Sequence, residues 1–521
     1  MKQKSSLSPF SRREFLAGLL GLAAGVAAHP RRRGGVLRFA TRGDATGLDP
    51  HRHTFYPVSV PLAAISQGLL DLDLHSEPAP GVAEAWEASA DLLTYTFRLR
   101  KGVLFHNGQE VEAAAVKWNF ARMQDPKTAH PFLRSALANL KEVEVVDRYT
   151  VRCHLHEPSA AFPANVVYYP CSLIAPESAA QAHLHPIGCG PFKFVRWERY
   201  RLTELARFEH YFETDATGTP LPYLDGLLGL PKREDRVRLT ALRAGEVDLI
   251  DSMPYADAAA FSTQYAGRFQ TWEVPALGTS YLIFNLDRGP FTDKRLRLAA
   301  AHAIDREAIH QAVFHGRGTI ARGFYPPGCP WYMPDVTPPP AYDPDKARFL
   351  LRQARAAGTE VVLQALSTYP YLRQTGELVQ AMWSEVGFNV RYYVYEAPVL
   401  QQKRRTREFD ADASSASYRF DPDGWFSRVL LSTAPSTKLH SGFRNEKADR
   451  LILEARRTAD KAKRKQLCAE IDSLVNAELP VLYLHHLTLL EAGVLHLKGY
   501  QPSVSGLFSI RGGGLRTAWL A

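Results

Sequence analysis

The sequence predicts an α/β protein with two or three domains. Its 521 residues exceed the length over which one hydrophobic core keeps growing. Residues 359–395 follow the order strand, helix, strand, which is typical of a βαβ unit in a parallel sheet. The first third of the chain instead alternates hairpin patterns with a helix, which indicates an α+β arrangement.

The composition is that of a folded protein, and the net charge does not indicate a nucleic-acid partner. Hydrophobic residues make up 45% of the chain and charged residues 22%, so the chain does not have the profile of a disordered protein. Much of the formal charge of +9 comes from the N-terminus. The one internal basic run, "QQKRRTRE" at 401–408, is interpreted as a solvated face.

The N-terminus predicts export from the cytoplasm. Residues 11–16, "SRREFL", are similar to a twin-arginine signal, and an apolar run follows to about Ala28. This run is too short, and too rich in glycine and alanine, for a stable membrane span. We expect residues 1–28 to be a signal peptide and the mature protein to be periplasmic. No cysteine follows the run, so no lipid anchor is expected.

The first third is predicted from its periodicity. The expected elements are a strand at 34–41, a helix from 58 to 68, a hairpin with Tyr95, Phe97 and Leu99 in one strand and 103–105 in the other, a helix at 110–125 and a hairpin that turns at 147–148. In the helix, we expect Val111, Ala115, Trp118 and Met123 to lie near one side.

The second half is predicted to be richer in helices. Expected helices are a pair within 289–314, one at 342–355 entered through Asp343-Pro344, one at 373–387 ended by Gly387, and two within 446–480. Asp305 is interpreted as a residue that stabilises a helix or packs the lobe. Strands are expected at 359–366, 388–395 and 481–494.

Several motifs, in order along the chain, resemble one known family. They include "VAEAWEASADLLTYTFRLRKGVLFHNGQEVEAAAVKWNF", "PIGCGPFKFVRWER", "GTSYLIFNLDRGPFTDKRLRLAAAHAIDREAI", "YDPDKARFLL" and "FDPDGWF". Each motif alone is weak, but together they resemble the family 5 extracytoplasmic solute-binding proteins of ABC importers, the peptide, opine and nickel type. The resemblance spans about residues 35 to 515.

The resemblance implies a two-lobed periplasmic-binding-protein fold of type II. Lobe I is expected at 35–280, with an extra α+β subdomain at about 70–185, lobe II at 281–482, and a return to lobe I at 483–521. The crossing strands are expected near 277–286 and 479–490, and the alternative is two buried strands within one lobe. Such lobes form a hinge around a cleft that closes on its ligand.

The implied function is capture of a small solute for import. The solute classes expected are peptide-like, opine-like and chelated metal, and a glycoside is also left open. The expected partners are the transmembrane subunits of an ABC permease with a cytoplasmic ATPase, because this chain has no GxxxxGK[ST] phosphate loop. We expect a monomer. The alternatives are an exported enzyme of unknown chemistry and a sensor or chemoreceptor ligand-binding protein.

The segment "SYRFDPDGWF", residues 417–426, is the candidate ligand loop. In peptide-binding members of the family, an aspartate three residues before the Asp/Glu-Pro pairs with the peptide ammonium, and Tyr418 stands at that position. A phenol in its place would weaken binding of ordinary peptides by about tenfold to more than a hundredfold, unless Asp421 or Asp423 substitutes. Arg419 would favour a carboxylate or phosphate if it faces the cleft. A solvent-facing turn is the alternative.

Other candidate contacts are less specific. Tyr281 and Asn285 lie on the expected crossing strand, where alternation sends some side chains toward the cleft; core packing is the alternative for Tyr281. His51 and Tyr56 follow "LDP", where family members bring a loop to the cleft, and a surface turn is the alternative. Trp425 either stacks against the ligand or packs in the core, and the core is the favoured interpretation.

No metal, cofactor or catalytic group is expected. The closest of the 18 histidines, such as His183 and His185, lack a third converging ligand. The five cysteines have no CxxC spacing, which disfavours structural zinc. Cys189 stands in a Gly-Cys-Gly-Pro turn without a nominated base, so catalysis there is not expected.

Overall fold

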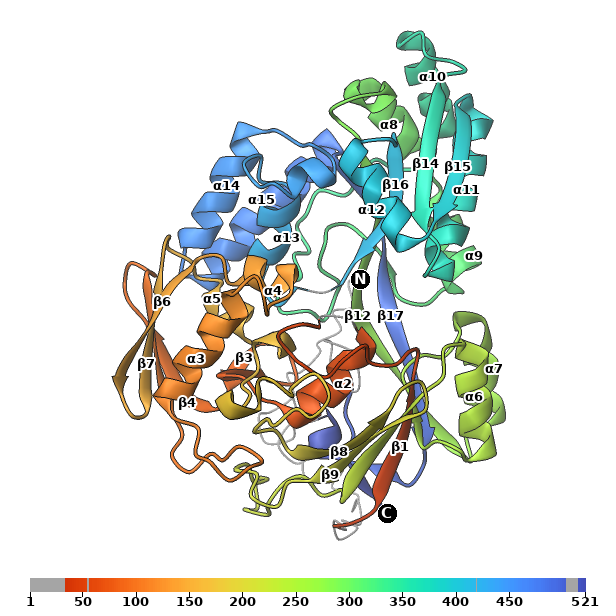
Figure 1. Ribbon diagram of the computed structural model, residues 1–521. Helices are drawn as coiled ribbons and strands as arrows, with labels where there is room; N and C mark the ends of the chain where they lie inside the picture. The colour runs from red at the N-terminus through yellow and green to blue at the C-terminus, as the bar shows by residue number, and fades with distance from the viewer. Residues whose placement is uncertain (1–32, 54–55, 418, 503–513) are drawn as a thin grey trace, which may run out of the picture.

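One large sheet runs through the computed structural model, which describes residues 33–53, 56–417, 419–502 and 514–521 (Figure 1). Its strands are β1 (Val36–Thr41), β8 (Phe192–Glu198), β9 (Leu202–Arg207), β10 (Gly226–Pro231), β11 (Leu249–Ile250), β12 (Phe269–Phe284), β13 (Thr319–Ile320), β14 (Glu360–Leu366), β15 (Asn389–Tyr395), β16 (Ala411–Ala416) and β17 (Val481–Val494). Their order is β15-β14-β16-β12-β17-β11-β1-β10-β9-β8, with β13 on β17. The predicted signal peptide at 1–28 lies outside the described residues.

The strands β12 and β17 join the two lobes. They pair antiparallel from Phe269 against Val494 to Ile283 against Val481. One end of the pair packs into a core with β1 and β10, and the other packs into a core with β14 and β15. Every residue of β17 is buried. A mostly apolar strand that is buried along its whole length is what a connection through two cores requires.

The first lobe surrounds β1. The helices α2 (Tyr56–Ile65), α6 (Asp235–Ala244) and α7 (Tyr255–Gln264) flank this part of the sheet (Figure 1). β1 pairs parallel with β10 and with β11. Its burial follows from its sequence, "VLRFAT", in which Leu37 and Phe39 point into the core.

An α+β module with its own core extends from this lobe. It contains the sheet β4-β5-β7-β6 and the helices α3, α4 and α5. The bounds are β4 (Ala83–Ala88), β5 (Thr94–Leu99), β6 (Leu140–Asp147), β7 (Thr150–Leu155), α3 (Ala113–Gln124), α4 (Pro131–Ala136) and α5 (Phe162–Val166). The predicted turn at 147–148 is confirmed, because β6 and β7 form a hairpin there.

The predicted hairpin between β5 and residues 103–105 is wrong. β5 pairs with β4 and β7, and residue Leu104 forms only an isolated bridge with Glu110. The turn at Gly102, with φ of 76°, sends Val103 and Phe105 into the module core instead. The buried face of α3 also differs from the expected one: Val116, Phe120 and Met123 are buried there, whereas Ala115 and Trp118 are only half-buried.

The second lobe confirms the predicted βαβ unit. β14 and β15 pair parallel, and the connecting helix α11 (Pro370–Val386) packs on both. Gly387 ends α11 with φ of 114°. The other helices are α8 (Lys294–His302), α9 (Arg306–Phe314), α10 (Pro344–Gln353), α12 (Ala397–Thr406), α13 (Asp423–Val429), α14 (Glu446–Arg457) and α15 (Lys461–Glu478).

Helix caps follow the sequence signals. Asp305 accepts a hydrogen bond from the Ala308 amide at 2.9 Å, and Asp343 accepts one from the Lys346 amide at 2.9 Å. Both carboxylates satisfy amides that have no partner within their own helix. The predicted helix-stabilising role of Asp305 and the entry of α10 at Asp343-Pro344 are therefore confirmed.

The remaining elements are short. They are β2 (Leu70–Leu72), β3 (Pro78–Pro80), β18 (Leu497–Lys498), β19 (Trp519–Leu520) and the single-turn helices η1 (Tyr169–Cys171), η2 (Pro176–Ser178), η3 (Pro290–Thr292), η4 (Thr437–Leu439) and η5 (Gly514–Arg516). Within the described ranges, no helix combines the length and apolar character needed to cross a membrane.

Candidate ligand-binding site

The predicted ligand loop joins β16 to α13. Tyr418 lies outside the described residues, so the structure reports nothing on it. Arg419 is half-buried, and its guanidinium carbon lies 5.5 Å from the centre of the Phe132 ring. The Trp331 indole donates a hydrogen bond to the Phe420 carbonyl oxygen at 3.0 Å. The loop is therefore attached to the second lobe while Arg419 reaches the module of the first.

Asp421 is held by the second lobe. Its carboxylate is 5% exposed and accepts a 2.6 Å charged hydrogen bond from Arg464 on α15. Burial alone would lower the pKa of Arg464. The charge and the hydrogen bond of Asp421 together outweigh burial, so the pKa of Arg464 is raised. The charged hydrogen bond between the buried Asp421 carboxylate and the Arg464 guanidinium fixes the position of the loop.

Trp425 and Tyr281 pack together in the core. Trp425 is 2% exposed and stacks on Phe324 with ring centres 4.1 Å apart. Its indole nitrogen donates to the Tyr483 hydroxyl at 3.1 Å. The Tyr281 ring lies 5.1 Å from Trp425, and burial raises the Tyr281 pKa to about 12. Both rings make internal contacts and support the loop from beneath.

Asn285 closes the end of β12. Its side chain is fully buried and donates to the Phe409 carbonyl oxygen at 2.8 Å. It also accepts hydrogen bonds from the Asp287 amide at 3.2 Å and from the Arg407 guanidinium. These partners use both ends of the amide, so Asn285 ties β12 to the segment that leads into β16.

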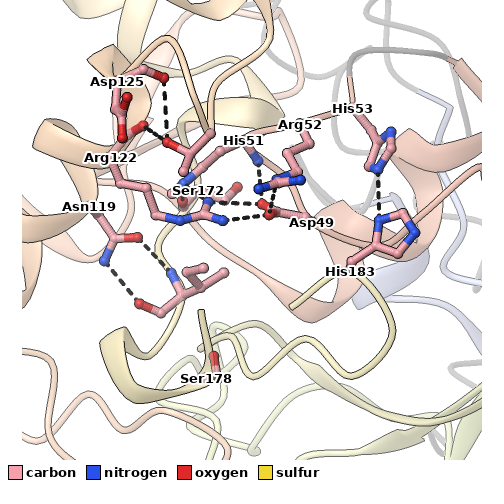
Figure 2. Close-up of polar contacts among 12 residues, drawn as sticks. Asp49, His51, Arg52, His53, Asn119, Arg122, Asp125, Ser172, Ser178 and His183 are labelled. Carbon is pink, nitrogen blue, oxygen red and sulfur yellow. Dashed lines mark hydrogen bonds and ion pairs between the residues drawn. The ribbon is translucent and has the colours of Figure 1, made fainter. Parts of the chain in front are cut away.

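His51 belongs to a buried polar cluster in the first lobe (Figure 2). Arg122 on α3 forms two hydrogen bonds with Asp49, at 3.0 and 2.5 Å, and donates to His51 Nδ1 at 2.6 Å. Because an arginine only donates, His51 carries its proton on Nε2, which donates to the Ser172 carbonyl oxygen at 2.9 Å. Burial first, and then the Arg122 charge, lower the His51 pKa to about 4. The imidazole is neutral at pH 7.

Two further histidines approach each other near this cluster. His53 Nε2 and His183 Nδ1 are 3.4 Å apart (Figure 2). No group of three histidine, cysteine or acidic side chains suited to a metal occurs within the described ranges. Tyr56 begins α2, and its side chain lies outside the described residues.

The loop meets an aromatic junction that sequence reasoning missed. We define the Phe132 junction as Phe132, Tyr168, Arg419, Phe420 and Arg428. Phe132 and Tyr168 meet edge to face at 5.8 Å, and Tyr168 meets Phe420 at 4.9 Å. The Arg428 guanidinium carbon lies 5.7 Å from the Phe132 ring centre. Residues of both lobes therefore converge here.

Polar contacts accompany the junction. The Ala160 amide donates to the Arg456 carbonyl oxygen at 2.8 Å, and the Arg456 guanidinium lies 3.6 Å from Glu157. The same guanidinium contacts Asp423, at 3.1 Å, in the first turn of α13. Lys461 pairs with Glu77. These groups connect α14 and α15 of the second lobe with the first lobe.

A separate surface pocket lies outside this region. Its volume is about 610 Å³, and residues 332–335, α14 and α15 line it. It is open to solvent and contains none of the predicted ligand contacts. We therefore place the candidate site at the Phe132 junction, where both lobes contribute side chains.

The fold is that of a two-lobed binding protein. The family model for bacterial extracellular solute-binding proteins, family 5, matches residues 77–438. The chain belongs to this family, whose members serve ABC importers.

Relatives match along nearly the whole chain. The di/tripeptide-binding protein 1 of Pseudomonas aeruginosa is 28% identical, covering 96% of this chain and 97% of the relative. The periplasmic binding protein DppA of Helicobacter pylori, solved with the peptide STSA, is 25% identical with a TM-score of 0.78 and covers 94% of this chain and 98% of that one. AgaA of A. tumefaciens R10, solved with agropinic acid, is 26% identical with a TM-score of 0.78 and covers 94% and 99%.

Proposed function

We propose that the protein captures a small solute between its lobes in the periplasm and delivers it to an ABC permease. The transmembrane subunits of the permease would accept the solute, and a cytoplasmic ATPase would supply the energy. The observation that carries the proposal is the convergence of a loop from one lobe on aromatic residues of the other, in a protein of the solute-binding family.

The mechanism is closure around the solute. The lobe boundaries that we propose are 35–280 with 483–521 for lobe I and 281–482 for lobe II, with the α+β subdomain at about 70–185. A solute that contacts both lobes would stabilise the closed form over the open form by its differential affinity. The permease would then recognise the closed form.

The solute classes that we propose are peptide-like, opine-like and chelated metal. The names of related proteins support the first two: one binds di- and tripeptides, and another was solved with agropinic acid. Ordinary peptides are disfavoured, because Tyr418 stands where peptide-binding members place a carboxylate. In the loop, Tyr418 and Arg419 remain the proposed direct contacts, whereas Asp421 and Trp425 would shape the site from behind.

The proposed route to the periplasm is the twin-arginine pathway. The paired Arg12-Arg13 followed by an apolar run supports it. This route would carry the protein across the membrane already folded. The mature protein would act as a monomer.

A thermal-shift panel tests the proposed function. The panel contains dipeptides, agropinic acid and the nickel complex of L-histidine, each with the purified mature protein. A bound solute present at about 100 times its Kd should stabilise the folded form by about 2.7 kcal/mol. Failure of every member of a broad panel to move the midpoint, together with the absence of a retained solute, would contradict the proposal.

A further inference from the structure

Two arginines approach the same aromatic ring at the Phe132 junction. Arg419 precedes α13 and Arg428 lies in its last turn, and their guanidinium carbons are 5.5 and 5.7 Å from the Phe132 ring centre. Guanidinium groups are attracted to the face of an aromatic ring. A group placed in this way keeps N–H edges available for a carboxylate or a phosphate.

Nearby carboxylates already have other partners. The three pairs are Asp412 with Arg404 at 2.7 Å, Asp421 with Arg464 at 2.6 Å and Asp423 with Arg456 at 3.1 Å. In the described part of the chain, neither Arg419 nor Arg428 forms an ion pair. The Tyr168 phenol at the junction is no counterion either, because burial raises its pKa and keeps it neutral at pH 7. The junction therefore holds two positive charges that the surrounding protein does not balance.

The Arg419 charge also acts on Arg428. Part of the Arg428 side chain is accessible to solvent. The partial loss of hydration, which is the larger cause, and the Arg419 charge both lower the pKa of Arg428. Like charges at one site destabilise each other's charged form, and an anion between them reverses this effect. The arrangement is unfavourable when empty and becomes favourable when an anion is bound.

We propose that Arg419 and Arg428 form an anion clamp and that the solute carries two negative charges, as two carboxylates or one phosphate monoester. The inference rests on the proposed function and names the solute class for it. Phe132 orients both guanidinium planes, and each guanidinium binds one anionic oxygen pair. Neutral and zwitterionic peptides lack the second negative charge and bind more weakly.

Titration calorimetry with two simple dianions tests the clamp. The probes are succinate for carboxylates and hydrogen phosphate for a phosphate group, with acetate as the single-charge comparison, all at constant ionic strength. We expect the wild-type protein to bind at least one dianion, and to bind it more tightly than acetate. The dianion that binds identifies the chemical group.

Arginine variants assign the site. Arg419→Gln and Arg428→Gln should each weaken binding of that dianion by about 10- to 100-fold, because each removes a charge-assisted hydrogen bond. Arg428→Lys should retain part of the affinity. Arg405→Gln is the matched control, since Arg405 is exposed on α12 and, among the described residues, donates to the Gln402 side chain alone. Its affinity should equal that of the wild type.

The outcomes separate the clamp from the proposed function. Wild-type protein that binds neither dianion, or glutamine variants that bind it as the wild type does, would overturn the clamp. If a neutral solute from the thermal-shift panel still binds in that case, the proposed function stands without the clamp. Unchanged unfolding midpoints of the variants show that lost binding does not come from lost folding.

Discussion

Arg122 joins three segments of the first lobe through one buried guanidinium. It contacts Asp49 and His51 from the loop after β1, and His51 in turn holds the Ser172 carbonyl oxygen. The Arg122 and Asp49 side chains are 7% and 2% exposed. When a buried charge loses its partner, water cannot take the partner's place. Loss of either Arg122 or Asp49 should therefore lower the stability of the folded protein.

Replacement of Arg122 by methionine should strongly destabilise the first lobe. The expected loss is about 3 kcal/mol, because the buried Asp49 would lose its short charged hydrogen bonds and keep the longer contact with half-exposed Arg52, at 3.4 Å. Arg98→Met is the control, since its pair with Glu87 spans 3.7 Å between side chains that are 64% and 65% exposed. That pair contributes about 1 kcal/mol or less. Urea unfolding measures both, and equal losses would contradict the account.

Asp472 is a buried acid beneath the loop. It accepts hydrogen bonds from the Phe324 amide at 3.1 Å and from the Tyr483 hydroxyl at 2.9 Å. Burial is the larger influence and raises its pKa to about 7, although both hydrogen bonds lower it. Tyr483 also contacts Trp425, so the carboxyl group is linked to the loop through two side chains.

The raised pKa of Asp472 predicts a pH-dependent stability. Between its unfolded pKa of about 4 and its folded pKa of about 7, the folded state binds the proton more tightly. Its contribution is therefore fully present below about pH 4 and is lost as the pH rises to 7, by at most about 1.4 kcal/mol per pH unit. Asp472→Asn should remove this contribution.

The difference between the Asp472→Asn and wild-type unfolding curves isolates this group from others that titrate in the same range. Urea midpoints from pH 4.5 to 8 measure it. Asp335→Asn is the control, because Asp335 is exposed and its curve should run parallel to that of the wild type. A parallel curve for Asp472→Asn would show that the buried carboxyl does not titrate as described.

At the level of elements, local signals in the sequence predicted most of the second lobe. The unit β14-α11-β15 follows from periodicity and a terminal glycine, and both features act within a few residues. Strand pairing in the α+β module depended on distant partners. β5 binds β7, about fifty residues later, and no local pattern distinguishes that partner from the nearer segment 103–105.

The same limit applies to the candidate site. The loop from Arg419 onward could be predicted because one stretch of sequence carries it. Phe132, Tyr168 and Arg428 could not, since they come from separate elements and belong to no motif. The sequence could place Asn285 on a crossing strand and His51 in the loop after "LDP". Their buried hydrogen bonds with Phe409 and Ser172 could not be predicted, because these depend on tertiary structure.

Gly278 in β12 has no room for a side chain. Its φ is 126°, and an added Cβ would lie 1.7 Å from the Ala416 carbonyl oxygen at the end of β16. Gly278→Ala should destabilise the protein by about 2 kcal/mol or more, because the neighbouring backbone must move. Gly267→Ala, with nothing within 4 Å of its Cβ, should be nearly neutral. Unfolding midpoints compare the two, and equal midpoints would contradict the assignment.

At the scale of the whole molecule, weak contacts between the lobes accompany the strong connection through β12 and β17. Glu77 and Glu157 of the first lobe pair with Lys461 and Arg456 of the second. Both carboxylates are accessible to solvent, at 32% and 57% of their side-chain surface. Such pairs suit a molecule that must open again to release its solute, because each contributes about 1 kcal/mol or less.

Removal of both carboxylates should favour the open form. The double variant Glu77→Gln/Glu157→Gln is expected to show a larger radius of gyration without solute and an affinity lower by a few-fold to about tenfold. Small-angle scattering and calorimetry measure these effects. Glu478→Gln is the control, because its pair with Lys294 lies within the second lobe. Identical scattering of the double variant and the wild type would contradict the role of these pairs.

Native mass spectrometry tests the central claim, capture of a small solute, most directly. The protein is purified gently from its own exported fraction, and its mass is measured intact and again after denaturation. We predict that a discrete mass is lost on unfolding and that the released compound carries two negative charges. An unchanged mass, combined with a thermal-shift panel in which no compound stabilises the protein, would contradict solute capture.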